Sequence, residues 1–285
     1  MKILVVGDGH SKIHEVAVAT ALAQLGHDVE TFYWASYLAA DSRLGAYISK
    51  AQNKFIMGPA IRRINRDLLA KAASCQPDLV FIYRGTHIRR SAVAGLRKRC
   101  PGVRVFGYNN DDPFAPGHPW YLWKTFLDAV PEYDLMFAYR HHNIPQFKAA
   151  GARRVELLRS WFLPWTNKPI ELDEQDRAWF DADVVFIGHH EADGRTEMLE
   201  AIVQRGWKFR LFGPGKAWNA LLPNNEALRP QLPVDMVWGD DYNRALCGSR
   251  IALCFLSKLN RDTYTRRCFE IPSTGTLMLS EYTDD

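Results

Sequence analysis

The sequence predicts an α/β protein of two lobes, each built on a parallel β-sheet. Short β-branched and leucine-rich runs alternate with helical patterns, as in sheets whose strands are buried on both faces. The alternation stops at the proline- and tryptophan-rich segment 160–169 and then begins again. The chain has 285 residues, 47% of them hydrophobic, which is enough for two ordinary cores. We therefore predict an N-terminal lobe (1–160), a linker (161–176) and a C-terminal lobe (177–285).

The first lobe opens with a strand, a helix and a second strand. Residues 2–7 form a continuous apolar run that ends in glycine, which is typical of a buried parallel strand. Residues 13–25 repeat apolar side chains at helical spacing, and 28–34 form the next strand. The segment 37–74 is mostly helical, and we interpret its arginines as a solvated face. Further strands of this lobe are expected at 78–83, 103–108, 134–138 and 155–158.

The pattern restarts after the linker. Strands are expected at 183–188, 209–213, 234–238, 251–255 and 276–280, and helices at 196–205 and 242–249. Asp181 and Asp183 have the D-x-D spacing of metal-bound sugar nucleotides. They stand at the start of a strand, however, which is the wrong end of a parallel sheet for a ligand. We therefore expect no metal site in this protein.

Polar side chains follow several strands of the first lobe, where ligands bind in open α/β sheets. His10 is either a ligand or acid–base group or a solvated loop histidine. The loop GDGH that contains it starts like a dinucleotide fingerprint, but Lys12 occupies the place of the third glycine. Asp111 and Asp112 end the fourth strand. One of them could act as a general base or bind acceptor hydroxyls, although an Asp-Pro turn has the same sequence.

The segment 260–275, NRDTYTRRCFEIPSTG, combines the groups that a nucleotide sugar needs. Arg266 and Arg267 can neutralise phosphate oxygens, and Asp262 and Glu270 can accept hydrogen bonds from hydroxyls. A surface helix that begins at an Asp cap and carries basic residues on its wet face has a similar composition. Because the segment follows a second α/β pattern, we favour its interpretation as a nucleotide-sugar site over that of a surface helix.

Two other loops of the second lobe follow strands. The run GHHEADGR places His189 and Arg195 where a helix begins, so an anion there would meet backbone N–H groups. Gly213 belongs to a glycine-containing loop, GPGK, that either lines a nucleotide base or forms a simple turn.

The runs FIGHHEADGR, RLFGPG and RDTYTRRCFEIPSTGTLMLSE together resemble the GT-B glycosyltransferases of family 4 type (glycosyl transferases group 1), particularly the CgeB-like branch. The similarity covers most of the second lobe, and the DDP strand end of the first lobe supports it. The resemblance implies two Rossmann-like lobes with a nucleoside-diphosphate sugar on the second. The acceptor, an unknown glycan, protein or small molecule, would bind the first lobe. Transfer would retain the anomeric configuration and would need no metal or other cofactor.

The resemblance also implies roles for single residues. Family 4 enzymes contact the donor with two acidic residues that have seven positions between them. Glu270 matches the second, which holds the ribose hydroxyls, and Asp262 matches the first, which approaches the transferred sugar, although it is a shorter carboxylate. The diphosphate would lie at the start of the helix that carries Glu270, near Thr263 to Arg267, a range that includes Thr265.

The chain departs from the family pattern in two places. After the first strand of the second lobe the family often carries an arginine and a lysine, but this chain has His189 and Gly194. Phosphate neutralisation would then fall to Arg195, Lys258 or Arg267. Family chains also continue beyond the last expected strand, so we expect the second lobe to be incomplete at its C-terminus.

Composition narrows the partners and the cellular compartment that can be expected. A net charge of +4 requires no nucleic-acid partner, and five dispersed cysteines without C-x-x-C spacing indicate free thiols in a reducing compartment. The first residues do not form a signal peptide, and no apolar run is long enough to span a bilayer. We therefore expect a cytoplasmic protein. Its alternative functions are those of a sugar-nucleotide epimerase or hydrolase of the same fold and of a catalytically silent sugar-nucleotide binder.

Overall fold

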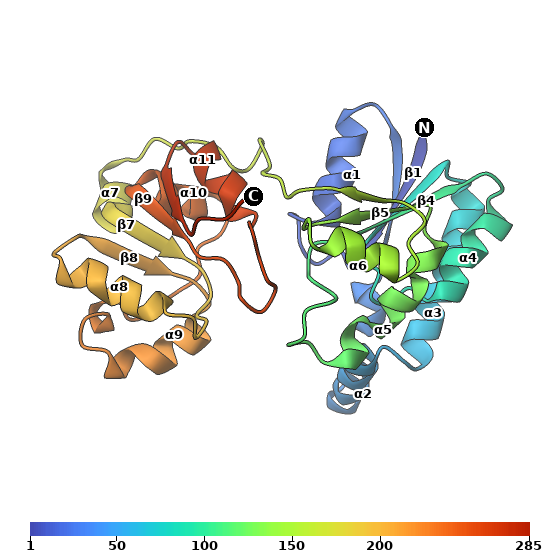
Figure 1. Ribbon diagram of the computed structural model, residues 1–285, viewed down its shortest axis with the longest axis horizontal. Coiled ribbons are helices and arrows are strands. Elements are labelled where there is room, and N and C mark those ends of the chain that lie inside the picture. Colours follow the sequence, from blue (N-terminus) through green and yellow to red (C-terminus); the bar gives the residue numbers. More distant parts are fainter. The chain divides into compact units, whose positions relative to one another are not determined.

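The computed structural model describes residues 1–285, apart from the side chain of Trp120. The chain divides into two compact units, Met1–Arg159 and Ser160–Asp285. Each unit contains one parallel β-sheet with helices around it (Figure 1).

The first unit contains a six-stranded sheet in the order β2-β1-β3-β4-β5-β6. All of its neighbouring strands pair in parallel, so their carboxyl ends lie along one edge. The strands are β1 (Lys2–Gly7), β2 (Asp28–Tyr33), β3 (Leu79–Tyr83), β4 (Arg104–Asn109), β5 (Leu135–Ala138) and β6 (Val155–Leu157). The α-helices are α1 (Glu15–Gln24), α2 (Arg43–Phe55), α3 (Pro59–Cys75), α4 (Arg90–Arg99), α5 (Trp120–Ala129) and α6 (Asn143–Ala149). Short 3₁₀ helices are η1 (Ala35–Leu38) and η2 (Val130–Glu132).

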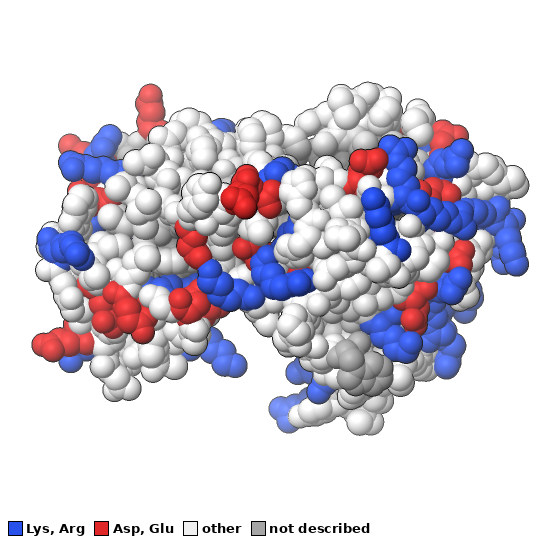
Figure 2. Space-filling model, viewed as in Figure 1, with Lys and Arg blue, Asp and Glu red and all other residues white. Residues whose placement is uncertain are grey.

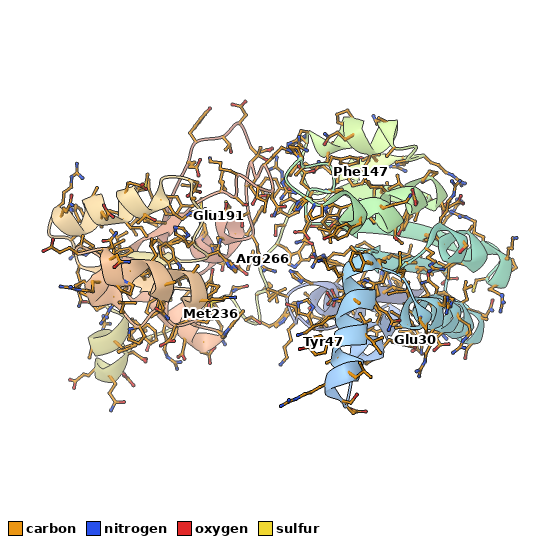
Figure 3. The ribbon with its side chains drawn as sticks, turned by 90° about the horizontal axis from the view of Figure 1, so that it is seen from below. Glu30, Tyr47, Phe147, Glu191, Met236 and Arg266 are labelled. Carbon is orange, nitrogen blue, oxygen red and sulfur yellow. The ribbon has the colours of Figure 1, made fainter. Side chains whose placement is uncertain are left out.

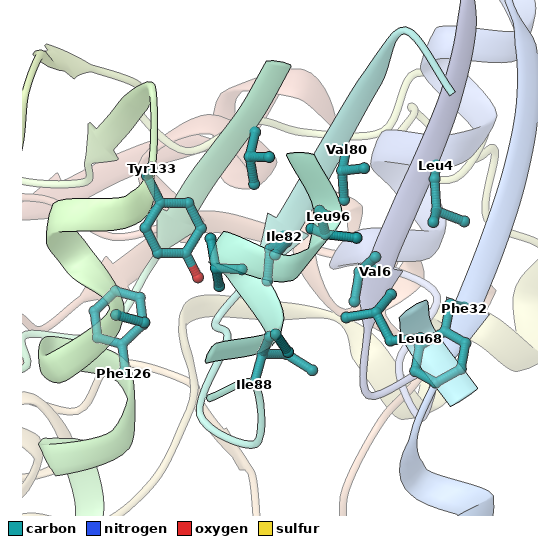
Figure 4. Packing of buried hydrophobic residues seen from close by; sticks show 14 of the residues in the cluster. Leu4, Val6, Phe32, Leu68, Val80, Ile82, Ile88, Leu96, Phe126 and Tyr133 are labelled. Carbon is teal, nitrogen blue, oxygen red and sulfur yellow. The ribbon is translucent and has the colours of Figure 1, made fainter. Parts of the chain in front are cut away.

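The main core of this unit lies between one face of the sheet and its helices (Figure 4). Leu4 and Val6 of β1 pack with Ile82 of β3, while α3 contributes Leu68 and α4 contributes Leu96. These five side chains are fully buried. Each such side chain contributes about 1.5–3 kcal/mol of transfer free energy, so the core fixes the strand ends that carry the polar loops.

The second unit contains a four-stranded sheet in the order β10-β9-β7-β8, again with parallel pairing. Its strands are β7 (Ala182–Ile187), β8 (Phe209–Phe212), β9 (Ser249–Cys254) and β10 (Leu277–Ser280). Its helices are α7 (Glu174–Phe180), α8 (Arg195–Gln204), α9 (Gly215–Leu221), α10 (Asp240–Cys247), α11 (Arg267–Ser273), η3 (Leu222–Asn224) and η4 (Arg229–Gln231). Alternate residues of β7 enter two different cores: Val184 and Phe186 face one, and Val185 and Ile187 face the other. Both faces of the sheet are therefore covered, as its apolar strands require.

The strand predicted at 234–238 is absent from the structure, and that prediction was wrong. The Asn219 side chain forms two hydrogen bonds with the backbone of Val234, through Oδ1 at 2.8 Å and Nδ2 at 3.1 Å. The carbonyl of Asp235 accepts from the N–H of Gly213 at 3.0 Å. Because a side chain and a single loop amide satisfy these backbone groups, this segment packs against the sheet without joining it.

Among the described residues, no helix combines the length and the apolar character that crossing a membrane requires. Asp181 and Asp183 lie at the amino end of β7, where Lys208 contacts both of them. The D-x-D pair thus stands at the amino end of its strand, as its place in the sequence predicted.

Candidate functional site

Glu270 lies on α11 with both carboxylate oxygens contacted by other side chains. The hydroxyl of Tyr242, on α10, donates to Oε2 at 3.1 Å, and Nε of Arg266 lies 2.9 Å from Oε1. Only 8% of Glu270 is exposed. Burial, and then the charge of Glu270, raises the pKa of Tyr242, so this hydroxyl remains a donor at neutral pH. A carboxylate oxygen can accept two hydrogen bonds, so Glu270 is an oriented acceptor that can still bind hydroxyls.

Arg267, at the first position of α11, reaches the end of β7. A Cβ built on Gly188 would lie only 3.3 Å from Nη2 of Arg267, so the missing side chain gives the guanidinium its space. Loss of hydration, and then the charges of Arg267 and Arg195, lowers the pKa of His189. No ion pair involves Arg267 within the part of the chain whose side chains are described. An unpaired guanidinium beside a neutral histidine is suited to binding phosphate oxygens.

The other cations predicted to bind phosphate have partners within the unit. Arg195 is 4% exposed, and its Nε and Nη2 donate to Asp193 at 2.8 and 2.6 Å. Its Nη1 donates to the carbonyl of His189 at 2.5 Å. Lys258 is exposed and pairs with Glu281. Arg266, which Figure 3 labels, pairs with Glu270 as described above. The geometry thus favours Arg267 among these candidates.

Asp262 and Thr265 lie in the loop between β9 and α11. The N–H of Asp262 donates to the carbonyl of Ser257 at 2.9 Å, and that of Thr265 donates to Sγ of Cys268 at 3.5 Å. The helix begins at Arg267, so the alternative of a surface helix that begins at an Asp262 cap was wrong. Asp262 is a half-buried loop residue, and its predicted contact with the sugar stays a prediction.

Gly213 lies where the ends of β7 and β8 come together. A Cβ at this position would lie 2.1 Å from the carbonyl oxygen of Gly188. The same oxygen accepts from Nε1 of Trp218 at 2.9 Å. Close backbone packing therefore accounts for the glycine, and its predicted contact with a nucleotide base stays a prediction.

The first unit has a separate cavity of about 560 Å³ at the carboxyl edge of its sheet. Asp8 and His10 line it from the end of β1, Trp34 from the end of β2, and Arg84 and His87 from the end of β3. The exposed ring of His10 lies with Nδ1 2.5 Å from Oδ1 of Asp8. Burial opposes ionisation of Asp8, but hydrogen bonds from His10 and its charge outweigh it and lower the pKa of Asp8.

The structure separates the environments of Asp111 and Asp112. Asp111 is partly exposed and pairs with Arg84, with 2.6 Å between Oδ2 and Nη2. Asp112 is fully buried and accepts from Nδ2 of Asn143 at 2.9 Å, with Nε2 of His142 3.2 Å from its other oxygen. Asp112 therefore ties its loop to α6, and the geometry favours Asp111 over Asp112 as a group that meets a ligand.

Two buried groups beside this cavity were not identified from the sequence. Glu15, 1% exposed, accepts from the N–H of Gly9 at 2.5 Å, and burial raises its pKa to about 6. His87 has Nε2 2.8 Å from Oδ1 of Asn53, and burial lowers its pKa to about 4. Neither has a sequence signal, because an acid in the first turn of a helix and a histidine after a strand are both ordinary. Tyr242 was also missed, because a tyrosine in a helix is equally ordinary.

Comparisons with known proteins give one matching family and several solved structures of similar fold. A family described as glycosyl transferase-like matches residues 195–285. Among solved structures, an E. coli trehalose-6-phosphate structure bound with UDP-2-fluoro glucose is 15% identical, with a TM-score of 0.57, over 90% of this chain and 78% of that chain. The UDP-GlcNAc 2-epimerase from Methanocaldococcus jannaschii is 10% identical, with a TM-score of 0.58, over 98% and 83% of the two chains. A putative UDP-N-acetylglucosamine 2-epimerase from Listeria monocytogenes is 11% identical, with a TM-score of 0.58, over 98% and 78%.

No curated protein matches the chain. Identities this low show a shared fold and leave the chemistry to be argued from the site. The two parallel α/β units have the GT-B fold, so the predicted fold class is confirmed.

Proposed function

We propose that this protein is a glycosyltransferase that takes a sugar from a nucleoside-diphosphate sugar bound to the second unit. The observation that carries the proposal is the pair of groups on α11: Glu270, oriented by Tyr242, and Arg267, which has no ion-pair partner among the described side chains. Residues three positions apart lie on neighbouring turns of one helix face. A ribose and a diphosphate, which are joined covalently in the donor, need such an acceptor and such a cation side by side.

The comparisons support a uridine nucleotide as the first donor to test. One of the matched structures holds UDP-2-fluoro glucose, and two others are named as UDP-GlcNAc 2-epimerases. The glycosyl transferase-like family also covers α11 and the loop before it. UDP-glucose and UDP-GlcNAc are therefore the sugars with which to begin.

In the proposed reaction, Glu270 accepts hydrogen bonds from the ribose hydroxyls and fixes the donor. As the bond between the anomeric carbon and the diphosphate oxygen breaks, negative charge grows on the diphosphate, and Arg267 stabilises it. Asp262 would contact the transferred sugar. The acceptor hydroxyl would bind in the first unit, where His10 and Asp111 are the groups available to take its proton. Retention of configuration, as the family resemblance implies, belongs to the proposal.

Nucleotide binding tests the donor site directly. UDP, GDP and ADP should be compared by thermal shift, because a ligand that binds the native state raises the unfolding midpoint. We expect UDP to raise the midpoint of the wild type and to do so far less for Arg267→Gln and Glu270→Gln. Arg250→Gln is the matched control, because this exposed arginine pairs with Asp183 at the amino end of the sheet. Absence of a shift with every nucleotide would contradict the proposal.

Product analysis separates a transferase or hydrolase, which releases UDP, from an epimerase and from a silent binder. A transferase releases UDP slowly from UDP-glucose even when water is the acceptor, and Glu270→Ala should lose this release. Equal, nonzero rates for the two proteins would remove Glu270 from its proposed role. Conversion of UDP-GlcNAc to its 2-epimer without UDP release would identify an epimerase. Binding with no turnover of either sugar, even when acceptors are supplied, would indicate a silent binder.

A further inference from the structure

Helix α2 of the first unit presents its apolar side chains to solvent. Leu44, Tyr47, Ile48 and Phe55 are 71%, 72%, 51% and 46% exposed. Their spacing places them on a single stripe of the helix. The helix contains no buried residue. A helix on the surface of a globular protein normally turns such a stripe toward the core, so α2 is oriented the opposite way.

Hydrogen bonds on the opposite face of α2 fix this orientation. Ser49 Oγ donates to the carbonyl of Leu38, and Gln52 Oε1 accepts from the N–H of Ala60 at 2.8 Å. Asn53 Oδ1 lies 2.8 Å from Nε2 of the buried His87. Rotation of the apolar stripe toward the core would break all three contacts and leave Nε2 of the buried His87 without this partner. The exposed stripe is therefore built into the fold.

The charges of α2 all have one sign. Between Arg43 and Phe55 the helix contains no Asp or Glu, and Arg43, Lys50 and Lys54 are exposed. Their spacing places the three cations along one border of the apolar stripe. On the face shown in Figure 2, the end of the first unit that Figure 1 labels α2 carries Lys and Arg side chains and no acidic ones. Tyr47, labelled in Figure 3, belongs to this helix.

The stripe continues into an apolar groove of about 880 Å³. Phe55, Met57 and Tyr121 line this groove. The ring centroids of Phe55 and Tyr121 are 5.6 Å apart. Two of the three cations that line it are paired, Lys124 with Asp128 and Arg90 with Glu132, both at 2.9 Å, and the third is Arg89. Arg89 and the cations of α2 are thus available to meet an external anionic partner.

We propose that α2 docks in the plane of an anionic lipid surface, with its apolar stripe at the boundary between headgroups and acyl chains. A basic amphipathic helix with exposed aromatic and aliphatic residues binds membranes in this way. A second copy of the chain is a poorer occupant, because the two cationic borders would repel each other. The cavity of the first unit is lined in part by Asn53 and Lys54 of the same helix. Asn53 lies on the face of α2 opposite the stripe, so docking would hold this cavity one helix diameter, roughly 10 Å, from the lipid surface.

Flotation of the full chain with vesicles tests the proposal without any nucleotide. We expect binding to vesicles of phosphatidylcholine with phosphatidylglycerol, weak binding to phosphatidylcholine alone, and release at high salt. The triple variant Leu44→Ser, Tyr47→Ser, Ile48→Ser should lose binding. The double variant Lys50→Gln, Lys54→Gln keeps the stripe and should bind about thirtyfold more weakly, or roughly fivefold for each lysine. Leu25→Ser is the control, because Leu25 is 72% exposed in the same unit but lies outside α2.

Three results would overturn the proposal. The first is a wild type that fails to float with the anionic vesicles, and the second is binding by the triple variant equal to that of the wild type. The third is a wild-type dimer, seen by gel filtration, that the triple variant converts to a monomer without any vesicle binding, since the stripe would then be a self-association face. Unfolding midpoints of all variants near that of the wild type would show that lost binding is not lost folding.

Discussion

The hydroxyl of Tyr242 donates to Oε2 of Glu270 at 3.1 Å, across 28 residues of sequence. The hydroxyl of Tyr133, a residue of the first unit that is 1% exposed, has no hydrogen-bond partner among the described residues. Removing the two hydroxyls should therefore have opposite results. Tyr242→Phe should lower the free energy of unfolding by about 1.5–3 kcal/mol, because it removes a hydrogen bond to a charged group. Tyr133→Phe should be neutral or stabilising, because it removes a buried polar atom without a partner.

Urea denaturation of the two variants beside the wild type measures both effects. The pair controls for the loss of a phenol hydroxyl as such. Equal destabilisation by the two substitutions would show that the contact with Glu270 contributes nothing specific. If the nucleotide site is as proposed, Tyr242→Phe should also weaken UDP binding, whereas Tyr133→Phe should not.

The stability of the first unit should fall between about pH 4.5 and pH 6 because of Glu15. Burial raises the pKa of this carboxyl from 4.5 to about 6, so the folded protein holds a proton that the unfolded chain has already lost. The stabilisation is complete below pH 4.5 and disappears as the pH rises through 6. A shift of this size corresponds to about 2 kcal/mol. Glu15→Gln should remove this fall and be more stable than the wild type above pH 6.

The measurement is the free energy of unfolding of both proteins at a series of pH values. Glutamine keeps an oxygen that can accept from the N–H of Gly9, so the loop contact is preserved. Glu156→Gln, at an exposed position of the same unit, is the control and should retain the wild-type slope. A Glu15→Gln curve parallel to that of the wild type would mean that Glu15 has an ordinary pKa.

Gly213→Ala should destabilise the second unit more than an alanine at another glycine with unusual backbone geometry. Its new methyl group would lie 2.1 Å from the carbonyl oxygen of Gly188, so the ends of β7 and β8 would have to separate. Gly206 also has a positive φ, of 78°, but no atom lies within 4 Å of a Cβ there. We expect about 1 kcal/mol of destabilisation for Gly206→Ala, from backbone strain alone, and at least twice as much for Gly213→Ala. Similar losses in a thermal or urea melt would show that the strand ends can separate easily.

The sequence was informative where local pattern decides structure. The apolar runs predict β1, β7 and β9 because strands buried on both faces need continuous hydrophobic residues. The same rule gave a false strand at 234–238, since the hydrogen bonds from Asn219 that occupy its backbone come from another element. Glu15 and Tyr242 were missed because their environments depend on burial and on partners that no local pattern reveals.

Helix α2 shows a further limit of sequence patterns. The apolar spacing of Leu44, Tyr47 and Ile48 indicates an amphipathic helix but not the direction in which its stripe points. That direction depends on Gln52 and Asn53, whose partners are Ala60 and His87. At the proposed donor site the residue types were predictable, whereas the choice among the cations required knowledge of their pairing. Arg195 is paired with Asp193, and Arg267 has no ion-pair partner among the described side chains.

The thiol of Cys268 should react faster at neutral pH than the thiols of the buried Cys75 and Cys100. A hydrogen bond from the thiol of Cys254, with 3.8 Å between the sulfurs, lowers the pKa of Cys268 to about 7, and the N–H of Thr265 and the charge of Arg267 act in the same direction. Burial raises the pKa of Cys75 and of Cys100, so these thiols should stay unreactive.

Alkylation by iodoacetamide, located by peptide mass spectrometry, should reach half its maximal rate at Cys268 near pH 7. Cys254→Ala removes the donor and should move this midpoint upward. Equal labelling of Cys268 and Cys75 at pH 7 would show that the thiolate is not stabilised.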